Sequence, residues 1–223
     1  GSRPGAAGEP GGAGPAAGGA GGGAAAAGAP GSGAQSLQCV HTLCGHESPI
    51  TAISYSPELD LVISGSESGM ICLHSVRKGK FIRAVTDLEG APVDVLLLTH
   101  TGYFVAHSWS DGLIHLFTLN GHKLMDTLTT QRVLSMAVNG PGNVLICGGE
   151  DGGLSLRNMH DLNQVHFIDL SQHGPIRCLW FNEDDQYLFI GSQDGSFTIC
   201  TNPEVRWRMI QAAIQRTPLL GAI

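Results

Sequence analysis

The sequence predicts an all-β protein, a β-propeller of which about four blades are present. The first observation is a turn ending in glycine that recurs along the chain, with its glycines 43, 40 and 43 residues apart. The four turns are Glu67-Ser68-Gly69, Ser110-Asp111-Gly112, Glu150-Asp151-Gly152 and Gln193-Asp194-Gly195. The second observation is that β-rich segments flank every turn, as in a hairpin. An all-β sandwich is the alternative, but a sandwich has no reason to repeat at fixed spacing.

Each repeat contains four candidate strands. The segments before the turns read LVISGS, YFVAHS, VLICGG and YLFIGS, and those after them read MICLHS, LIHLFTL, GLSLRN and SFTICT. A further apolar segment precedes each hairpin, beginning with ITAISYS at 50–56, and segments such as KFIRAV and KLMDTL follow it. Four antiparallel strands per roughly 40–45 residues are typical of a propeller blade. We also expect residues 39–43 to form an outer strand that leads into the first blade.

Composition divides the chain into three parts. The first 34 residues contain 14 Gly, 12 Ala and 4 Pro and offer no large side chains to bury, so residues 1–36 are predicted to be disordered. Residues 37–215 are predicted to form the blades, and residues 216–223 a C-terminal tail. Because four blades leave two blade faces and strand edges uncovered, we expect the chain to be part of a larger propeller.

Charge and apolar patterning exclude several classes of protein. The formal net charge of −7 argues against a nucleic-acid partner. No apolar run reaches the roughly 18–20 residues that span a bilayer, so membrane contact is expected to be peripheral or through partners. The cysteines are scattered, several within strand-like runs, and are expected to be reduced and mostly buried. They are Cys39, Cys44, Cys72, Cys147, Cys178 and Cys200.

The segment GHESPITAISYSPELDLVISGSESGMICLHS at 45–75 resembles the WD repeat. The resemblance implies a tetrad within each blade, made by a loop His, a strand Ser or Thr, a turn Asp and a closing Trp. The implied structural residues are Gly45, His46, Ser64, Asp111, Gly112, Asp151, Gly152, Asp194 and Gly195. No blade has the whole tetrad: Ser68 replaces the first turn Asp, and the Trp positions hold His74, Phe117, Arg157 and Cys200. We therefore expect the blades to depend more on apolar packing.

A narrower resemblance covers roughly residues 40–215. The Leu-Asn-Gly turn near Asn120-Gly121, the divergent Trp positions and Trp207 are similar to the C-terminal propeller of the BEACH-domain, neurobeachin-like family. This resemblance implies a non-enzymatic protein-interaction scaffold in vesicle and membrane trafficking, cytoplasmic and peripherally associated with endomembranes. It also implies BEACH and PH-like domains upstream in the full-length protein. The alternative is a WD-repeat adaptor for another complex, such as substrate recognition by a ubiquitin ligase.

Metal and catalytic sites are not expected. Cys39, His41, Cys44 and His46 are four possible zinc ligands within eight residues. On a strand, however, Cys39 and His41 would share one face, and Cys44 and His46 the other, so the four could not surround one tetrahedral metal. We predict no metal, no cofactor and no catalytic residues, and a metal-dependent or hydrolytic propeller enzyme is the least favoured alternative.

Partner binding is expected on the loops of one propeller face, because loops on a rigid scaffold carry contacts. The candidate partner-binding residues are Glu47, Glu67, Trp109, Ser110, Glu150 and Gln193. Trp109 is the strongest candidate, since an exposed Trp beside a turn suits an interface anchor. The alternative for Trp109 is burial between blades. Arg177, Trp180 and Trp207 are expected to be structural.

Overall fold

The computed structural model describes residues 38–88, 90–182 and 184–201. The chain divides into two units, Gly1–Cys39 and Val40–Ile223, and every strand described below belongs to the second. The disordered segment predicted for 1–36, Trp207 and the tail predicted for 216–223 lie outside the described residues. The proposed domain boundaries therefore stay predictions.

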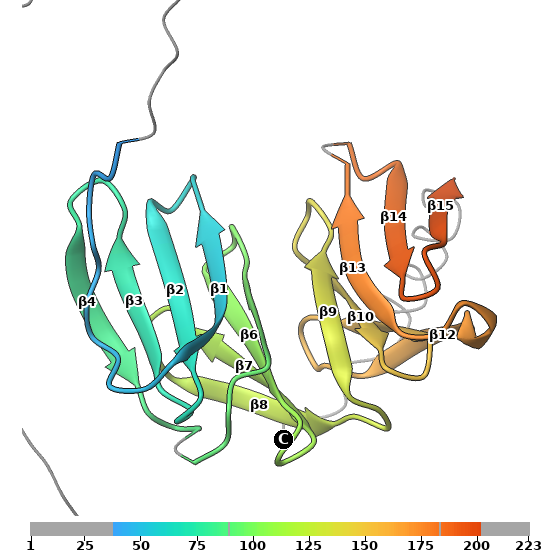
Figure 1. Ribbon diagram of the computed structural model, residues 1–223, viewed down its shortest axis with the longest axis horizontal. Helices are drawn as coiled ribbons and strands as arrows, with labels where there is room; N and C mark the ends of the chain where they lie inside the picture. The colour runs from blue at the N-terminus through green and yellow to red at the C-terminus, as the bar shows by residue number, and fades with distance from the viewer. Residues whose placement is uncertain (1–37, 89, 183, 202–223) are drawn as a thin grey trace, which may run out of the picture. The chain divides into compact units, whose positions relative to one another are not determined.

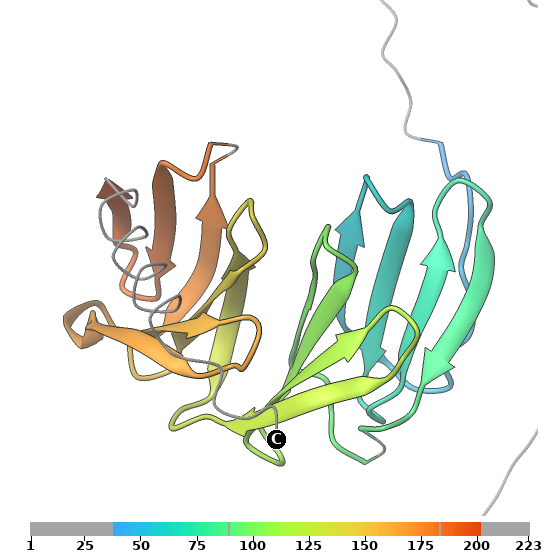
Figure 2. The same ribbon diagram turned by 180° about the vertical axis from the view of Figure 1, so that it is seen from behind.

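Fifteen described strands form four antiparallel sheets, and in each sheet the strands are hydrogen-bonded in chain order (Figures 1 and 2). Blade one holds β1 (Ile50–Ser56), β2 (Leu61–Ser66), β3 (Ile71–Ser75) and β4 (Lys80–Val85). Blade two holds β5 (Val95–Leu98), β6 (Tyr103–Ser108), β7 (Leu113–Thr118) and β8 (Lys123–Leu128). Blade three holds β9 (Val133–Val138), β10 (Val144–Gly149), β11 (Gly153–Asn158) and β12 (Gln164–Asp169). Blade four holds β13 (Ile176–Phe181), β14 (Tyr187–Ser192) and β15 (Phe197–Thr201), after a short 3-10 turn at Ser171–His173.

The predicted all-β, four-blade architecture is confirmed, but the predicted outer strand at 39–43 is wrong. Residues 38–49 contain no strand, and the first strand begins at Ile50. A strand needs a neighbouring strand to complete its backbone hydrogen bonds. In the first sheet β4 holds the outer position, and the end of this segment instead contacts the sheet through the His46–Ser64 and His74–Cys44 hydrogen bonds.

Turn chemistry closes the hairpins between the second and third strands of the blades. In blades two to four the turn aspartate accepts a hydrogen bond from the N–H two residues later, which is the Asx geometry of tight turns. The pairs are Asp111–Leu113 (2.9 Å), Asp151–Gly153 (2.8 Å) and Asp194–Ser196 (2.8 Å). The glycine after each aspartate has φ of +70°, +83° and +87° in turn, a conformation that glycine adopts without steric cost. These turns therefore require the Asp-Gly pair.

Apolar packing between successive blades forms the core. One cluster joins blades one and two around Ile63 and Phe104, a second joins blades two and three around Val105 and Leu145, and a third joins blades three and four. Each fully buried Leu, Ile or Phe contributes about 1.5–3 kcal/mol relative to an exposed one. Stability therefore comes mainly from blade-to-blade contact, as the incomplete tetrads predicted.

Aromatic and histidine side chains fill the positions left by the missing tetrad members. Phe117, at a position where the WD pattern has Trp, stacks on Phe104 with ring centroids 4.9 Å apart. In blade one, His46 Nε2 lies 2.8 Å from Ser64 Oγ, and His74 Nε2 lies 3.0 Å from the carbonyl oxygen of Cys44. The first blade thus keeps a polar link between its loop and its strands.

The cysteines divide by position. Cys72 and Cys147 are buried, and burial raises the pKa of the Cys147 thiol to about 12, so this thiol stays protonated. Cys178 and Cys44 are exposed. The expectation of burial in strand-like runs is therefore wrong for Cys178, because its side chain points to the face of β13 that no described blade covers.

His107 joins blade two to blade three. Its ring is fully buried, Nε2 accepts a hydrogen bond from the N–H of Val133 at 3.2 Å, and Nδ1 lies 2.9 Å from the carbonyl oxygen of Leu113. Because Nε2 accepts, the proton of the neutral ring is on Nδ1. Burial lowers the pKa of His107 below its ordinary value, so the folded protein holds this ring neutral.

We predict that Gly152→Ala destabilises the protein much more than Gly195→Ala. Both residues have positive φ, which costs an alanine roughly 1 kcal/mol. A Cβ at Gly152 would also lie 2.7 Å from Ser171 Cα and 2.9 Å from the carbonyl oxygen of Gly174, whereas at Gly195 no atom of the described residues lies within 4 Å. Urea unfolding should show a loss of about 1 kcal/mol for Gly195→Ala and at least about 2–3 kcal/mol for Gly152→Ala. Equal losses would contradict the described packing.

We predict that acid destabilises the fold partly through His107. The unfolded chain binds the proton with the ordinary His pKa of about 6.5, whereas the folded pKa is lower. Stability is therefore complete above pH 6.5 and falls as the pH drops from there towards the folded pKa. His107→Gln should reduce the loss of unfolding free energy between pH 7 and pH 5, measured by urea titration at each pH.

Exposed His122 provides the matched control for this measurement. His122→Gln, the same substitution at an exposed position, should leave the free energy of unfolding at pH 7 close to that of the parent protein. At pH 7, His107→Gln should itself cost about 1–2 kcal/mol, because one or both buried hydrogen bonds of the ring are lost. A parent and a His107→Gln protein with the same pH slope would show that His107 does not titrate in this way.

Candidate protein-interaction face

The four hairpin turns and the loops that precede β1, β5, β9 and β13 lie at the same end of the blades, because antiparallel strands alternate in direction. We call this end the turn face. In three blades the residue before the turn donates its N–H to a carbonyl oxygen of the preceding loop, at 2.9 Å each time. The pairs are Glu67–Pro49, Glu150–Arg132 and Gln193–Pro175. Each turn is thus fixed to its own loop.

All six predicted partner-binding residues are exposed and lie on the turn face. They are spread over the four blades, and the structure does not gather them into one cleft. Ser110 bonds to Ser108 at 2.9 Å, and the side-chain carbonyl of Gln193 accepts from the Arg177 guanidinium at 2.6 Å. Burial between blades, the alternative for Trp109, does not occur, since this side chain is 45% exposed.

Blade two departs from the shared loop-to-turn bond, and the exception creates a distinct patch. The N–H of Trp109 donates to Asp94 Oδ2 at 2.7 Å instead of to a carbonyl oxygen. The other carboxylate oxygen, Oδ1, accepts from Arg132 Nη2 at 2.8 Å. One carboxylate therefore holds the backbone of an exposed Trp and the guanidinium of a residue in the loop of blade three. We call Asp94, Trp109 and Arg132 the Trp109 patch.

The Trp109 patch combines an aromatic side chain with a guanidinium whose hydrogen-bond donors are only partly used. The Arg132 side chain is partly exposed, whereas the Asp94 side chain is mostly covered. A guanidinium carries five N–H donors, and in the described structure Asp94 is the one carboxylate paired with Arg132. Tryptophan and arginine are the residues most enriched among binding hot spots. Sequence reasoning missed Asp94 and Arg132, because the WD pattern specifies neither loop position.

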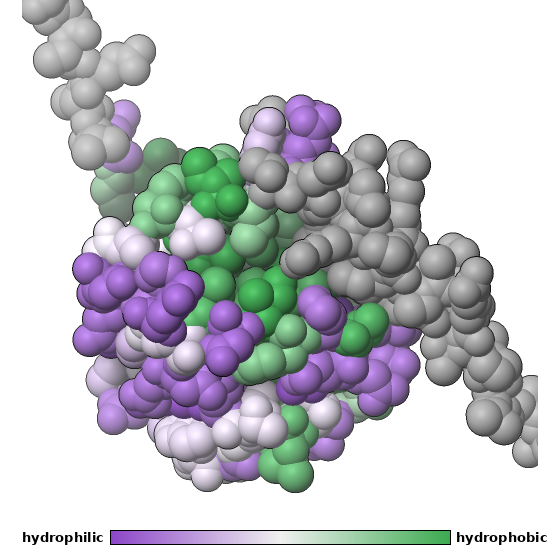
Figure 3. Space-filling model, turned by 90° about the vertical axis from the view of Figure 1, so that its right-hand side faces the viewer, coloured by the Kyte–Doolittle hydropathy of each residue, from purple (hydrophilic) through white to green (hydrophobic). Residues whose placement is uncertain are grey.

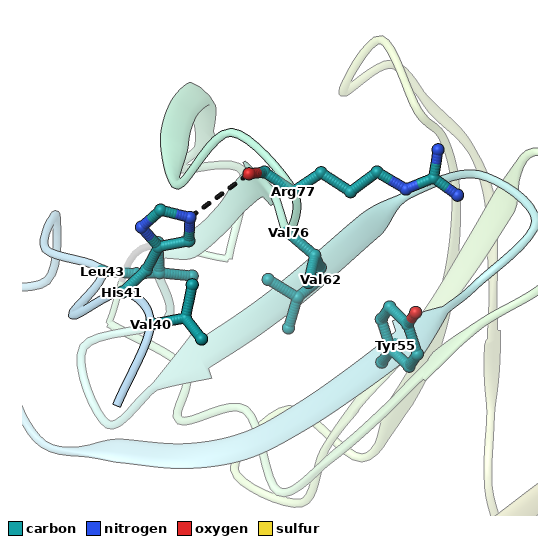
Figure 4. Close-up of a pocket in the computed structure, with 7 residues that line it drawn as sticks. All are labelled: Val40, His41, Leu43, Tyr55, Val62, Val76 and Arg77. Atoms are coloured by element: carbon teal, nitrogen blue, oxygen red, sulfur yellow. Dashed lines mark hydrogen bonds between the residues drawn. The ribbon is translucent and has the colours of Figure 1, made fainter. Parts of the chain in front are cut away.

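Two hollows lie on blade one. A polar one of about 340 Å³, on the turn face, is lined by Glu47, Ser48, Ser68, Met70 and Thr86. A larger apolar one of about 570 Å³ lies on the face of the sheet away from blade two (Figure 4). Its lining residues are Val40, His41, Leu43, Tyr55, Val62, Val76 and Arg77. The polar hollow enlarges the surface around the predicted Glu47.

The described residues hold no group of three or more His, Cys, Asp or Glu side chains placed to bind a metal ion. In the Cys39–His46 segment, His46 instead contacts Ser64, and His41 Nε2 lies 3.2 Å from the carbonyl oxygen of Arg77. Within the same described ranges, no helix is long and apolar enough to cross a membrane.

Trp180, expected to be structural, is 71% exposed on β13.

Comparison with known proteins identifies relatives over most of the chain. The chain is 30% identical over 168 residues to BEACH domain-containing protein B of Arabidopsis thaliana, and 27% identical over 172 residues to BEACH domain-containing protein lvsE of Dictyostelium discoideum. These matches cover 74% and 71% of this chain but only 6% and 8% of the two relatives. The β-propeller domain of Cps50 (Swd1) from Myceliophteria_thermophila is similar in fold, with a TM-score of 0.61 at 19% identity over 74% of this chain and 55% of that one.

A family model describing the neurobeachin β-propeller domain matches residues 35–209. This range includes all fifteen strands and the Trp109 patch. With its four WD-type blades, the chain belongs to the neurobeachin β-propeller domain family.

Proposed function

We propose that this chain is a non-enzymatic scaffold module that binds a partner protein through the Trp109 patch on its turn face. The observation that carries the proposal is the shared carboxylate of Asp94, which accepts from the backbone N–H of an exposed Trp and from the guanidinium of a partly exposed Arg. Holding the Trp109 backbone and the Arg132 guanidinium in place reduces the conformational entropy that these residues lose on binding. A partner segment with an acidic residue beside an apolar one would satisfy both groups.

The wider role that we propose follows from the family. The chain would be the propeller of a larger BEACH-type protein that acts in vesicle and membrane trafficking, with BEACH and PH-like domains upstream. It would work in the cytoplasm and associate peripherally with endomembranes, through its partners. Membership of the neurobeachin family supports this role over that of a ubiquitin-ligase adaptor.

The test uses the full chain as bait and partners captured from cytosol, followed by titration of each captured protein in purified form. Trp109→Ala should weaken binding at least tenfold, because truncation of a hot-spot aromatic costs more than about 1.4 kcal/mol. Arg132→Gln should weaken binding and also flatten its dependence on salt, since a cation at an interface rim acts through screened charge.

The matched control is Phe167→Ala on β12. Phe167 is an aromatic residue with nearly the same exposure as Trp109, but it lies on the outer strand of blade three, outside the Trp109 patch. This variant should bind as the parent protein does. A partner whose affinity is unchanged by Trp109→Ala and Arg132→Gln would place the binding site elsewhere on the propeller.

A further inference from the structure

Blade two departs from blades one and three at one position of the second strand. By strand register, Gly65 of blade one and Gly148 of blade three are equivalent to His107 of blade two. Both glycines lie against the next blade. A Cβ at Gly65 would lie 2.6 Å from Val93 Cγ1, and a Cβ at Gly148 would lie 2.5 Å from Ile176 Cγ2. The boundary between blades two and three therefore holds an imidazole ring where these two boundaries leave room only for a hydrogen atom.

The histidine also changes the hydrogen bond that joins the blades. Where blade one meets blade two, the N–H of Val93 donates to the carbonyl oxygen of Ser66 at 3.1 Å. Where blade two meets blade three, the corresponding N–H, that of Val133, donates to Nε2 of His107 at 3.2 Å. A carbonyl oxygen accepts at every pH, whereas an imidazole nitrogen accepts only while it carries no proton. The second link therefore depends on the protonation state of a side chain, and the first does not.

His107 is bonded to both sides of the Trp109 patch. Its backbone carbonyl oxygen accepts from the N–H of Asp94 at 2.9 Å. Its ring accepts from Val133, the residue that follows Arg132. Trp109 itself lies two residues further along the chain, just after the end of β6. The two charged residues of the patch are thus positioned through the backbone and the ring of one buried histidine.

The charged groups around the ring come from three elements of the described structure. Asp94 precedes β5, Asp111 lies in the hairpin turn of blade two, and Arg132 precedes β9. Burial is the largest effect and lowers the pKa of His107; the hydrogen bond at Nδ1 and the two carboxylates act in the opposite direction, and the guanidinium lowers the pKa further. The ring is therefore neutral at pH 7, and a proton on it would add a second cation near Arg132.

We propose that His107 is a proton switch for the Trp109 patch, which is assembled while the ring is neutral and comes apart when the ring takes up a proton from solvent. A protonated ring has an N–H at both nitrogens, so Nε2 and the N–H of Val133 become two donors facing each other. The loop that carries Val133 and Arg132 then moves away, and the guanidinium leaves Asp94. The carboxylate that accepts from the Trp109 N–H loses its second partner. This inference rests on the proposed function, because it assigns a regulation to the same surface.

The direction of the effect follows from the assembled patch being the form that binds. Affinity is complete above the folded pKa of His107 and falls by up to about tenfold per pH unit below it, because the ring must release one proton before binding. The folded pKa lies below the ordinary value of about 6.5, so the loss begins in mildly acidic solution. By reciprocity, a bound partner should lower the pKa of His107 further.

The first measurement uses the free full chain and needs no partner. Nuclear magnetic resonance of isotope-labelled protein follows the His107 ring and the backbone amides of Val133 and Trp109 between pH 7 and pH 5, wherever circular dichroism shows the folded state. All three signals should change with one midpoint. In His107→Gln, which lacks the titrating ring, the two amides should stay constant. His74→Gln is the matched control, because it removes a buried histidine of blade one; it should leave the common midpoint in place.

The second measurement titrates the captured partner against the full chain at pH 7 and at pH 5.5. The affinity of the parent protein should fall by the factor that the measured midpoint of His107 predicts, up to about tenfold for each pH unit below that midpoint. The affinity of His107→Gln should be nearly the same at both pH values. Titrating groups of the partner affect the parent and the variant alike, so the difference between them reports the ring of His107.

Two results would overturn the inference. Amides of Val133 and Trp109 that do not follow the titration of His107 would show that the ring is not coupled to the patch, even where Trp109→Ala still weakens binding. A pH dependence of binding that persists in His107→Gln would place the titrating group elsewhere.

Failure of the proposed function would look different. The side of the molecule that carries β14 and β15 shows hydrophobic surface among polar residues (Figure 3). A partner that binds on that side would be unaffected both by Trp109→Ala and by the protonation of His107. The free chain would still show the common midpoint of the ring and the two amides, which would support the switch while removing the proposed binding surface.

Discussion

The structure depends on one constraint: a four-stranded sheet with two apolar faces cannot be stable until another sheet covers each face. The three clusters between successive blades satisfy this constraint for the interior faces. Local hydrogen bonds such as Asp151 to the N–H of Gly153 shape the hairpins, but a single bond of this kind adds only about 1 kcal/mol net. The burial of Phe104 or Leu145 contributes more, and this explains how the blades tolerate missing tetrad residues.

The same constraint places the interaction face at the ends of the blades. On internal blades, both sheet faces are buried against the neighbouring blades. The loops and turns at the blade ends are therefore the surface that remains variable. On this surface Asp94 connects two neighbouring blades by accepting from the Trp109 backbone and the Arg132 guanidinium. Binding residues from different blades therefore keep a fixed relation because the blades beneath them are packed. Because the core is rigid, the residues of the candidate site are already held in place before a partner binds.

Much of the fold could be predicted from the sequence because the repeat is local. Asp-Gly turns about 40 residues apart, each between β-rich segments, define the hairpins without any long-range information. What could not be predicted depends on neighbours in space. The segment 39–43 alternates like a strand, but its place in a sheet depends on which strand lies beside it. Trp180 is a large apolar residue in a strand, as many core residues are, but its exposure depends on whether a further blade covers β13.

The candidate site shows the same division. Trp109 could be found from its place before a turn, since that position is fixed by the repeat. Asp94 and Arg132 could not, because their pairing joins loops 38 residues apart and no repeat position requires it. This polar pair breaks the repeat at one blade boundary and holds the backbone of an exposed Trp. A blade does not need such a pair, since blades one, three and four close the same turn with a backbone carbonyl. The departure therefore marks the blade-two to blade-three boundary as the part of the turn face that differs from the scaffold, and it is there that specificity for one partner can reside.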